Sequence, residues 1–96
     1  MTKQELVRAK RDEILRLAKR HGATNVRMFG SVVRGQDDNE SDLDVLVETG
    51  AQTTALFPGG LVADLEDLLG CRVDVVTEAA LHPYIRERVL EEAKPL

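Results

Sequence analysis

Apolar residues recur along this chain with two periods, one typical of helices and one typical of strands. Near the start they follow one face of a helix, which predicts a helix over residues 3–21. Thr2 and Glu5 match a capping box at the start of this helix, and Gly22 suits its end. The apolar positions on this face are Leu6, Ala9, Ile14, Leu17 and Ala18.

Three short apolar or alternating segments predict strands. They are residues 25–29, 43–48 and 72–77. An apolar stripe between the second and third strands predicts a helix that opens at Pro58 and ends at Gly70. Pro83 fits the first turn of a last helix. This order of elements predicts an α/β (α+β) fold, in which helices pack on a small mixed β-sheet.

Acidic residues interrupt the apolar pattern of two strands. Asp42 and Asp44 are two positions apart, so they point to one side with Cα atoms roughly 6.6 Å apart. Asp74 lies inside the apolar run 73–76, where a charge costs several kcal/mol unless it is paired or metal-bound. If the two strands are neighbours, the three carboxylates can hold one or two Mg²⁺ ions. The alternatives are a solvated sheet face, or Arg72 pairing with one carboxylate.

A Gly-Ser pair follows the first predicted strand. Gly30 allows close backbone approach, and the Ser31 hydroxyl with the N–H groups of the next turn can bind phosphate oxygens. Arg34 can neutralise phosphate charge. Most Gly-Ser pairs are plain turns, and the chain has neither a Walker P-loop nor a G-x-G-x-x-G motif. The indication of a phosphate-binding site comes from the combination of this turn with the carboxylates.

The combined motif resembles the signature of the minimal nucleotidyltransferases of the DNA polymerase β superfamily. Residues 30–35 read Gly-Ser-Val-Val-Arg-Gly, six residues intervene, and residues 42–47 read Asp-Leu-Asp-Val-Leu-Val. The usual form is G-S-x-A-R-G, a spacer and S-D-x-D, so Val33 replaces the usual Ala. The resemblance implies a polymerase β palm-like fold, binding of ATP with Mg²⁺, and transfer of AMP to an acceptor hydroxyl.

The resemblance also implies roles for individual residues. Gly30 and Ser31 would hold the β- and γ-phosphates of ATP. The carboxylates of Asp42 and Asp44 would ligate Mg²⁺. Asp74, which resembles the third family carboxylate, would complete the metal site and help deprotonate the acceptor. Arg34 would either bind phosphate or brace the turn through an internal salt bridge.

A partner is implied by the resemblance as well. Many small members of the family are antitoxins of a HEPN-domain toxin, and the better understood ones attach AMP to a toxin tyrosine. Two alternatives stay open. One is a catalytically silent antitoxin that binds nucleotide and masks its toxin by contact. The other is a transferase for small molecules, although its relatives usually carry an added substrate-binding region.

Composition narrows these possibilities. The 96 residues predict one domain, 1–96, and the net charge of −4 disfavours direct nucleic-acid binding. A single cysteine, Cys71, can form no internal disulfide, which together with the lack of a signal peptide predicts a cytoplasmic protein. No apolar run approaches the roughly 20 residues of a membrane span. We expect His21 and His82 to be caps or surface residues, Tyr84 to pack, and residues 37–40 to form a solvated loop.

Overall fold

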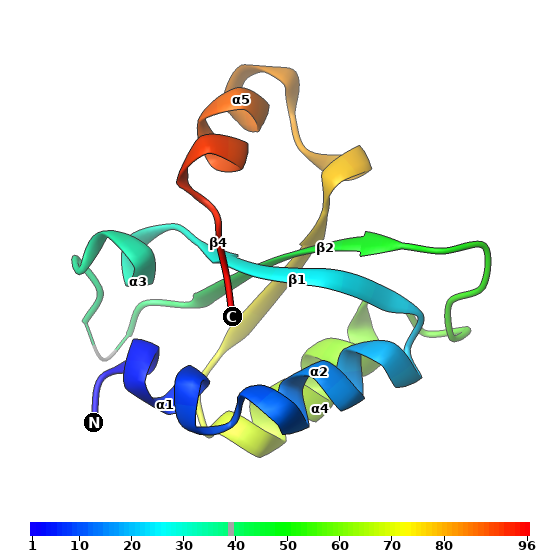
Figure 1. The fold of residues 1–96 in the computed structure, drawn as a ribbon, viewed down its shortest axis with the longest axis horizontal. Coiled ribbons are helices and arrows are strands. Elements are labelled where there is room, and N and C mark those ends of the chain that lie inside the picture. The colour runs from blue at the N-terminus through cyan, green and yellow to red at the C-terminus, as the bar shows by residue number, and fades with distance from the viewer. Residues whose placement is uncertain (39) are drawn as a thin grey trace.

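The computed structural model describes residues 1–38 and 40–96, and it places helices on both faces of a β-sheet (Figure 1). The α-helices are α1 (Lys3–Ala9), α2 (Arg11–Arg20), α3 (Ser31–Arg34), α4 (Gly59–Leu69) and α5 (Pro83–Glu92). The strands are β1 (Ala23–Phe29), β2 (Leu43–Thr49), β3 (Val73–Thr77) and β4 (Lys94–Pro95), and a short 3-10 helix, η1 (Glu78–Ala80), follows β3. The predicted loop 37–40 includes Asn39, which lies outside the described residues.

The sheet is mixed, as the sequence predicted. Its strand order is β3-β2-β1-β4. β2 pairs antiparallel with β1 and parallel with β3, while β4 pairs antiparallel with β1. The two strands that carry the aspartates are therefore neighbours, and the register sets Asp44 directly opposite Asp74.

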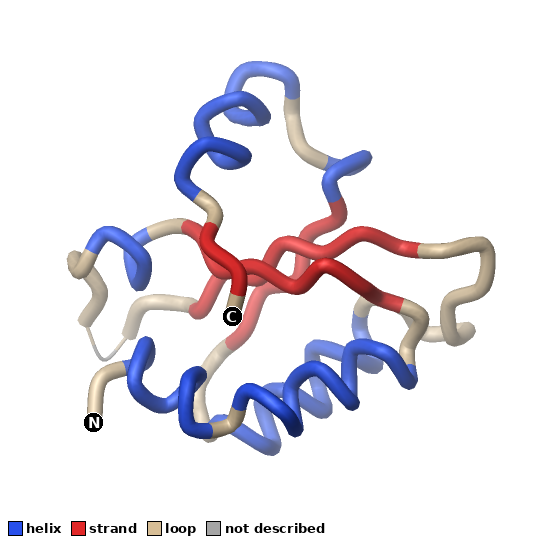
Figure 2. Tube along the Cα trace, in the orientation of Figure 1, coloured by secondary structure: helices blue, strands red, loops and turns tan. Residues whose placement is uncertain are grey.

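One face of the sheet is covered by α1, α2 and α4, which form the lower layer in Figure 2. The alternation in β2 explains this packing, because every second side chain points to the same face of a strand. The β2 residues buried under these helices are Leu43, Val45 and Val47. Their helical partners include Ile14, Ala18, Leu61 and Leu65.

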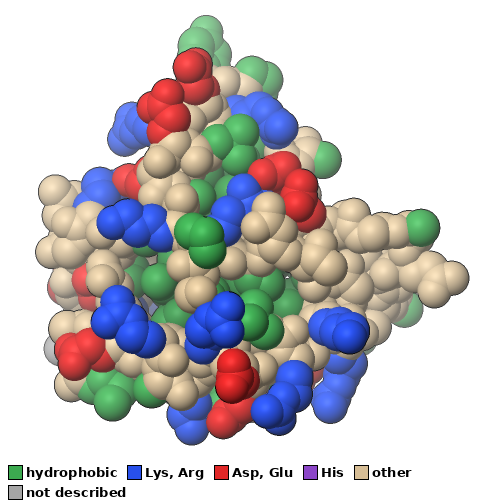
Figure 3. Space-filling model, in the orientation of Figure 1, with side chains coloured by type: hydrophobic (Ala, Val, Ile, Leu, Met, Phe, Trp, Pro, Cys, Tyr) green, Lys and Arg blue, Asp and Glu red, His purple; other side chains and the backbone are tan. Residues whose placement is uncertain are grey.

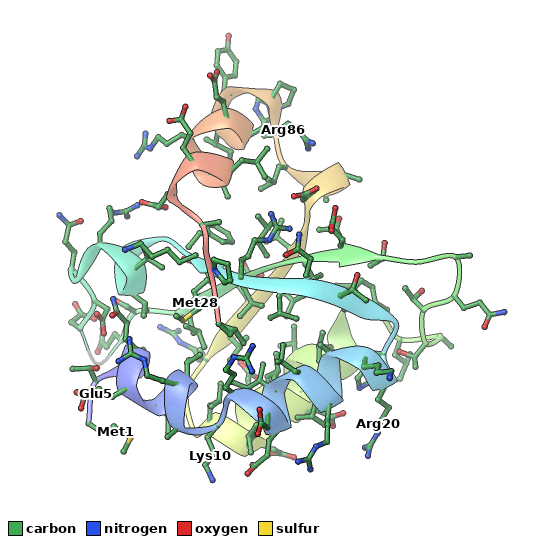
Figure 4. All side chains as sticks on the ribbon, in the orientation of Figure 1. Met1, Glu5, Lys10, Arg20, Met28 and Arg86 are labelled. Atoms are coloured by element: carbon green, nitrogen blue, oxygen red, sulfur yellow. The ribbon has the colours of Figure 1, made fainter. Side chains whose placement is uncertain are left out.

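The opposite face is covered only in part, by η1 and α5. Leu46, which shares this face with Asp44, is fully buried in a second cluster with Leu81 and Val89. α5 stands apart from the lower layer (Figure 4), and Arg86 on it donates to the Glu78 backbone carbonyl of η1. Ile85 of α5 remains 46% exposed.

Two predictions about local structure were wrong. The single helix expected over residues 3–21 is broken at Lys10, whose side chain points away from the sheet (Figure 4). The break lets α1 contact α3 while α2 packs on β1 and α4, two directions that one straight helix cannot serve. Tyr84, expected to pack, is 92% exposed and stacks on His82 with ring centroids 5.4 Å apart.

Both histidines act as helix caps, as expected. His21 is the C-cap of α2, and its side chain lies 2.7 Å from Thr54 Oγ1 and 2.7 Å from Asp64 Oδ2. It thereby ties the loop before α4 to the end of α2. His82 is the N-cap of α5 and accepts a hydrogen bond from the Tyr84 backbone N–H. Among the helices of the described residues, none is both long and apolar enough to cross a membrane.

Candidate active site

The three predicted carboxylates lie at one end of the β2–β3 pair, but they differ in surroundings. Asp44 is partly buried, whereas Asp42 and Asp74 are exposed. Asp44 and Asp74 face each other across neighbouring strands. Asp42 precedes β2, and its Oδ1 lies 3.0 Å from Arg72 Nε. The alternative in which Arg72 pairs with a carboxylate therefore describes Asp42.

Asp44 has an unusual protonation equilibrium. Burial, and then the negative charges of Asp74 and Asp42, raise the pKa of Asp44 from 3.8 to about 6. Arg34 opposes this rise but does not cancel it. The folded protein thus holds a carboxylate whose charge lacks sufficient compensation. A bound cation is the simplest source of that compensation.

The donor set fits a divalent cation by its chemistry. Carboxylate oxygens are the ligands that Mg²⁺ prefers, and Asp44 and Asp74 supply them from adjacent strands. Over residues 1–38 and 40–96, no three His, Cys, Asp or Glu side chains are grouped closely enough to hold a metal ion. Asp42 pairs with Arg72 instead. Asp42 would therefore join the site as a third carboxylate only by exchanging the Arg72 guanidinium for the metal ion.

Arg72→Gln tests this competition. The side chains of Arg72 and Asp42 are 69% and 50% exposed, so we expect the free energy of unfolding to change by less than about 0.5 kcal/mol. Loss of the competing guanidinium should tighten Mg²⁺ binding about threefold, as expected for an exposed ion pair. Calorimetric Mg²⁺ titration measures this, with the exposed Arg16→Gln as control. Weaker Mg²⁺ binding would show that Arg72 orients Asp42 for the metal.

The Gly30 turn is pressed against Asp44. Gly30 has φ +81°, a conformation that side-chain-bearing residues rarely adopt. A Cβ atom at this position would lie 2.2 Å from Asp44 Oδ2. Ser31 follows at the start of α3 and is partly buried. The pairing of β1 with β2, in which Phe29 lies opposite Asp44, brings the predicted phosphate turn beside the carboxylates.

Arg34 is held by an internal salt bridge. Its Nη1 donates to Glu92 Oε1 at 2.5 Å, and its Nε donates to Gln36 Oε1 at 3.2 Å. The second oxygen of Glu92 accepts from the Gly30 backbone N–H at 2.9 Å. Of the two roles considered for Arg34, bracing the turn is the one present in this structure. No motif or periodicity in the sequence indicated Glu92, a glutamate at a helix end 62 residues beyond Gly30.

Comparison with known proteins agrees with this geometry. The family model described as "Nucleotidyltransferase domain" matches residues 9–96. The chain belongs to the nucleotidyltransferase family. The family predicted from the Gly-Ser and Asp-Leu-Asp motifs is therefore confirmed, as is its fold class.

Two curated relatives of this nucleotidyltransferase come from archaea. Protein adenylyltransferase MntA of Thermococcus cleftensis is 40% identical over 79% of this chain and 77% of its own length. A candidate protein adenylyltransferase of Methanocaldococcus jannaschii is 37% identical over 84% of this chain and 87% of its own length.

Solved structures share the fold. A structure described as a candidate minimal nucleotidyltransferase is 50% identical, with a TM-score of 0.86, over 100% of this chain and 97% of that chain. A toxin–antitoxin structure with AMP-PNP matches at a TM-score of 0.73 and 21% identity, over 88% of this chain and 69% of that chain. At that identity the second likeness concerns the fold alone.

Proposed function

We propose that this chain is a Mg²⁺-dependent protein adenylyltransferase that moves AMP from ATP to a tyrosine of a HEPN-type toxin and so acts as an antitoxin. The observation that carries the proposal is the register of the sheet, which sets Asp44 opposite Asp74 beside the Gly30 turn. The turn, Asp44 on β2 and Asp74 on β3 thereby border one site. The names of the archaeal relatives support protein as the acceptor class.

Each residue has a role in this proposal. Ser31 binds the β- and γ-phosphates, Gly30 lets them approach the backbone of the turn closely, and Arg34 offsets their charge. Asp42, Asp44 and Asp74 would hold Mg²⁺, which supplies charge neutralisation of the triphosphate when bound. The acceptor oxygen attacks the α-phosphorus, the bond between that phosphorus and the bridging oxygen to the β-phosphate breaks, and diphosphate leaves. Asp74, which is more exposed than Asp44, accepts the proton of the acceptor hydroxyl.

A second function is favoured by a specific observation. Asp42 is engaged by Arg72, and no metal-holding group of three is formed within the described part of the chain. A protein that kept this arrangement would bind nucleotide without turnover. It would then neutralise a toxin by contact, as a silent antitoxin.

Label transfer separates the two functions. The chain is mixed with the product of its neighbouring gene, Mg²⁺, and ATP radiolabelled at the α-phosphate. We expect the label on the neighbour, none with Asp42→Asn/Asp44→Asn, and normal labelling with Asp67→Asn, an exposed aspartate on α4. A complex that binds ATP but transfers no label would replace the enzyme by the silent antitoxin.

A further inference from the structure

Glu92 joins two parts of the phosphate turn. Its two carboxylate oxygens take the Gly30 backbone N–H, at 2.9 Å, and the Arg34 guanidinium, at 2.5 Å. The side chain is only 18% exposed. A single carboxylate from the last helix therefore fixes both the first residue of the turn and its cation.

The sheet explains why Glu92 reaches this place. β1 and β4 pair antiparallel, with Met28 opposite Lys94. Continuing this register by two residues along each strand sets Gly30 opposite Glu92, because antiparallel partners move in opposite directions along the sequence. β4 is only two residues long, yet it fixes where the end of α5 meets the turn.

We propose that Glu92 is a positioning residue of the phosphate-binding turn, which holds Gly30 and Arg34 ready for the triphosphate of ATP. This inference rests on the proposed function. Glu92 approaches Gly30 from the β4 edge of β1, whereas Asp44 belongs to β2 on the other edge. The carboxylate thus braces the turn from the side away from the aspartates.

The charges agree with a bracing role. Burial opposes ionisation of Glu92, but the hydrogen bonds from Gly30 and Arg34 outweigh it and lower the pKa of this carboxyl below its usual value. Glu92 is therefore ionised at neutral pH, and its charge is matched by Arg34. Within the described contacts, Nη2 of Arg34 has no partner, so it can face a phosphate while Nη1 stays with Glu92.

The alternative is that Glu92 stands in for a phosphate and must be displaced. Bracing and displacement predict opposite signs. If Glu92 braces the turn, loss of its carboxylate weakens ATP binding, because the turn and Arg34 lose their fixed orientation. If Glu92 competes with phosphate, loss of its carboxylate strengthens ATP binding.

Glu92→Gln, compared with Glu91→Gln, decides between them. Glu91 is the exposed neighbour on the same helix, so its variant removes an equal charge. With Mg²⁺ present we expect Glu92→Gln to raise both the Kd and the KM for ATP about tenfold, the lower range for a lost charged hydrogen bond. We expect kcat to change less than about threefold and Glu91→Gln to match the wild type, because the brace acts on phosphate binding. Hydrogen exchange at the Gly30 amide should quicken in Glu92→Gln only.

Arg34→Gln is a second variant that keeps the Gly30 contact. Adding Glu92→Gln to it should cost less ATP affinity than in the wild type, because the two residues act through one ion pair. Unchanged or tighter ATP binding by Glu92→Gln overturns the inference, as does full additivity of the two substitutions. If the wild-type protein binds ATP but labels no acceptor, only the proposed transfer is overturned. A wild-type protein that binds no ATP with Mg²⁺ overturns both.

Discussion

Asp44→Asn is expected to reduce AMP transfer by roughly a thousandfold while the protein stays folded, a loss of about 4 kcal/mol of transition-state stabilisation. Asp44 is the carboxylate that touches both halves of the site. It lies opposite Asp74 on β3 and against Gly30 at the end of β1. Steady-state label transfer measures the loss, and transfer within tenfold of wild type would remove Asp44 from the catalytic residues.

The same variant, Asp44→Asn, is expected to raise the free energy of unfolding at neutral pH. The pKa of Asp44 is about 6 in the folded protein and 3.8 ordinarily, so its favourable contribution is present below pH of about 4 and is lost as pH rises through about 6. Because the side chain is only partly buried, solvent screening limits this loss to about 1 kcal/mol. In Mg²⁺-free buffer at pH 7, Asp44→Asn should therefore unfold at higher denaturant concentration than wild type. An advantage that persists at pH 4 would contradict this assignment.

Gly30→Ala should lower the free energy of unfolding by about 3 kcal/mol, because strained backbone and steric conflict act together. The new Cβ would lie 2.2 Å from Asp44 Oδ2, in a backbone conformation with φ +81°. Gly35→Ala is the matched control, since Gly35 also has positive φ, +72°, but a Cβ there meets no atom within 4 Å. We expect that control to cost about 1 kcal/mol. Denaturant unfolding of both variants measures the difference.

A double variant separates strain from collision. Gly30→Ala/Asp44→Ala removes the carboxylate that the new methyl group meets, while the backbone strain stays. Gly30→Ala should therefore cost less stability in the Asp44→Ala background than in the wild type. Equal costs in the two backgrounds would show that backbone strain alone explains the loss.

The sequence predicted the features that depend on local pattern. The apolar and alternating segments predicted strands over residues 43–48 and 72–77, and the structure has β2 at Leu43–Thr49 and β3 at Val73–Thr77. The pairing of Asp44 with Asp74 followed once the two strands were taken as neighbours, which the structure confirms. The motif block then identified the family before any fold was known.

Features that depend on distant partners were not predictable. The helix break at Lys10 results from α1 and α2 packing on different elements. The residues around Lys10 carry no pattern that predicts this break. β4 has two residues, one of them a proline, and carries no strand pattern of its own. The role of Glu92 was not predictable for a related reason, since its partners Gly30 and Arg34 are about sixty positions earlier in the sequence. Tyr84 was misjudged because an aromatic side chain does not reveal whether its helix face is covered.

The contact between Glu92 and Gly30 also bears on when the protein becomes active during translation. The ribosome makes the Gly30 turn and all three aspartates well before residues 92–95. Until those residues emerge, β4 cannot pair with β1, and the turn lacks the carboxylate that fixes it. Nascent chains should therefore gain tight ATP binding only after residues 92–95 have emerged, which delays enzyme activity until β4 pairs with β1.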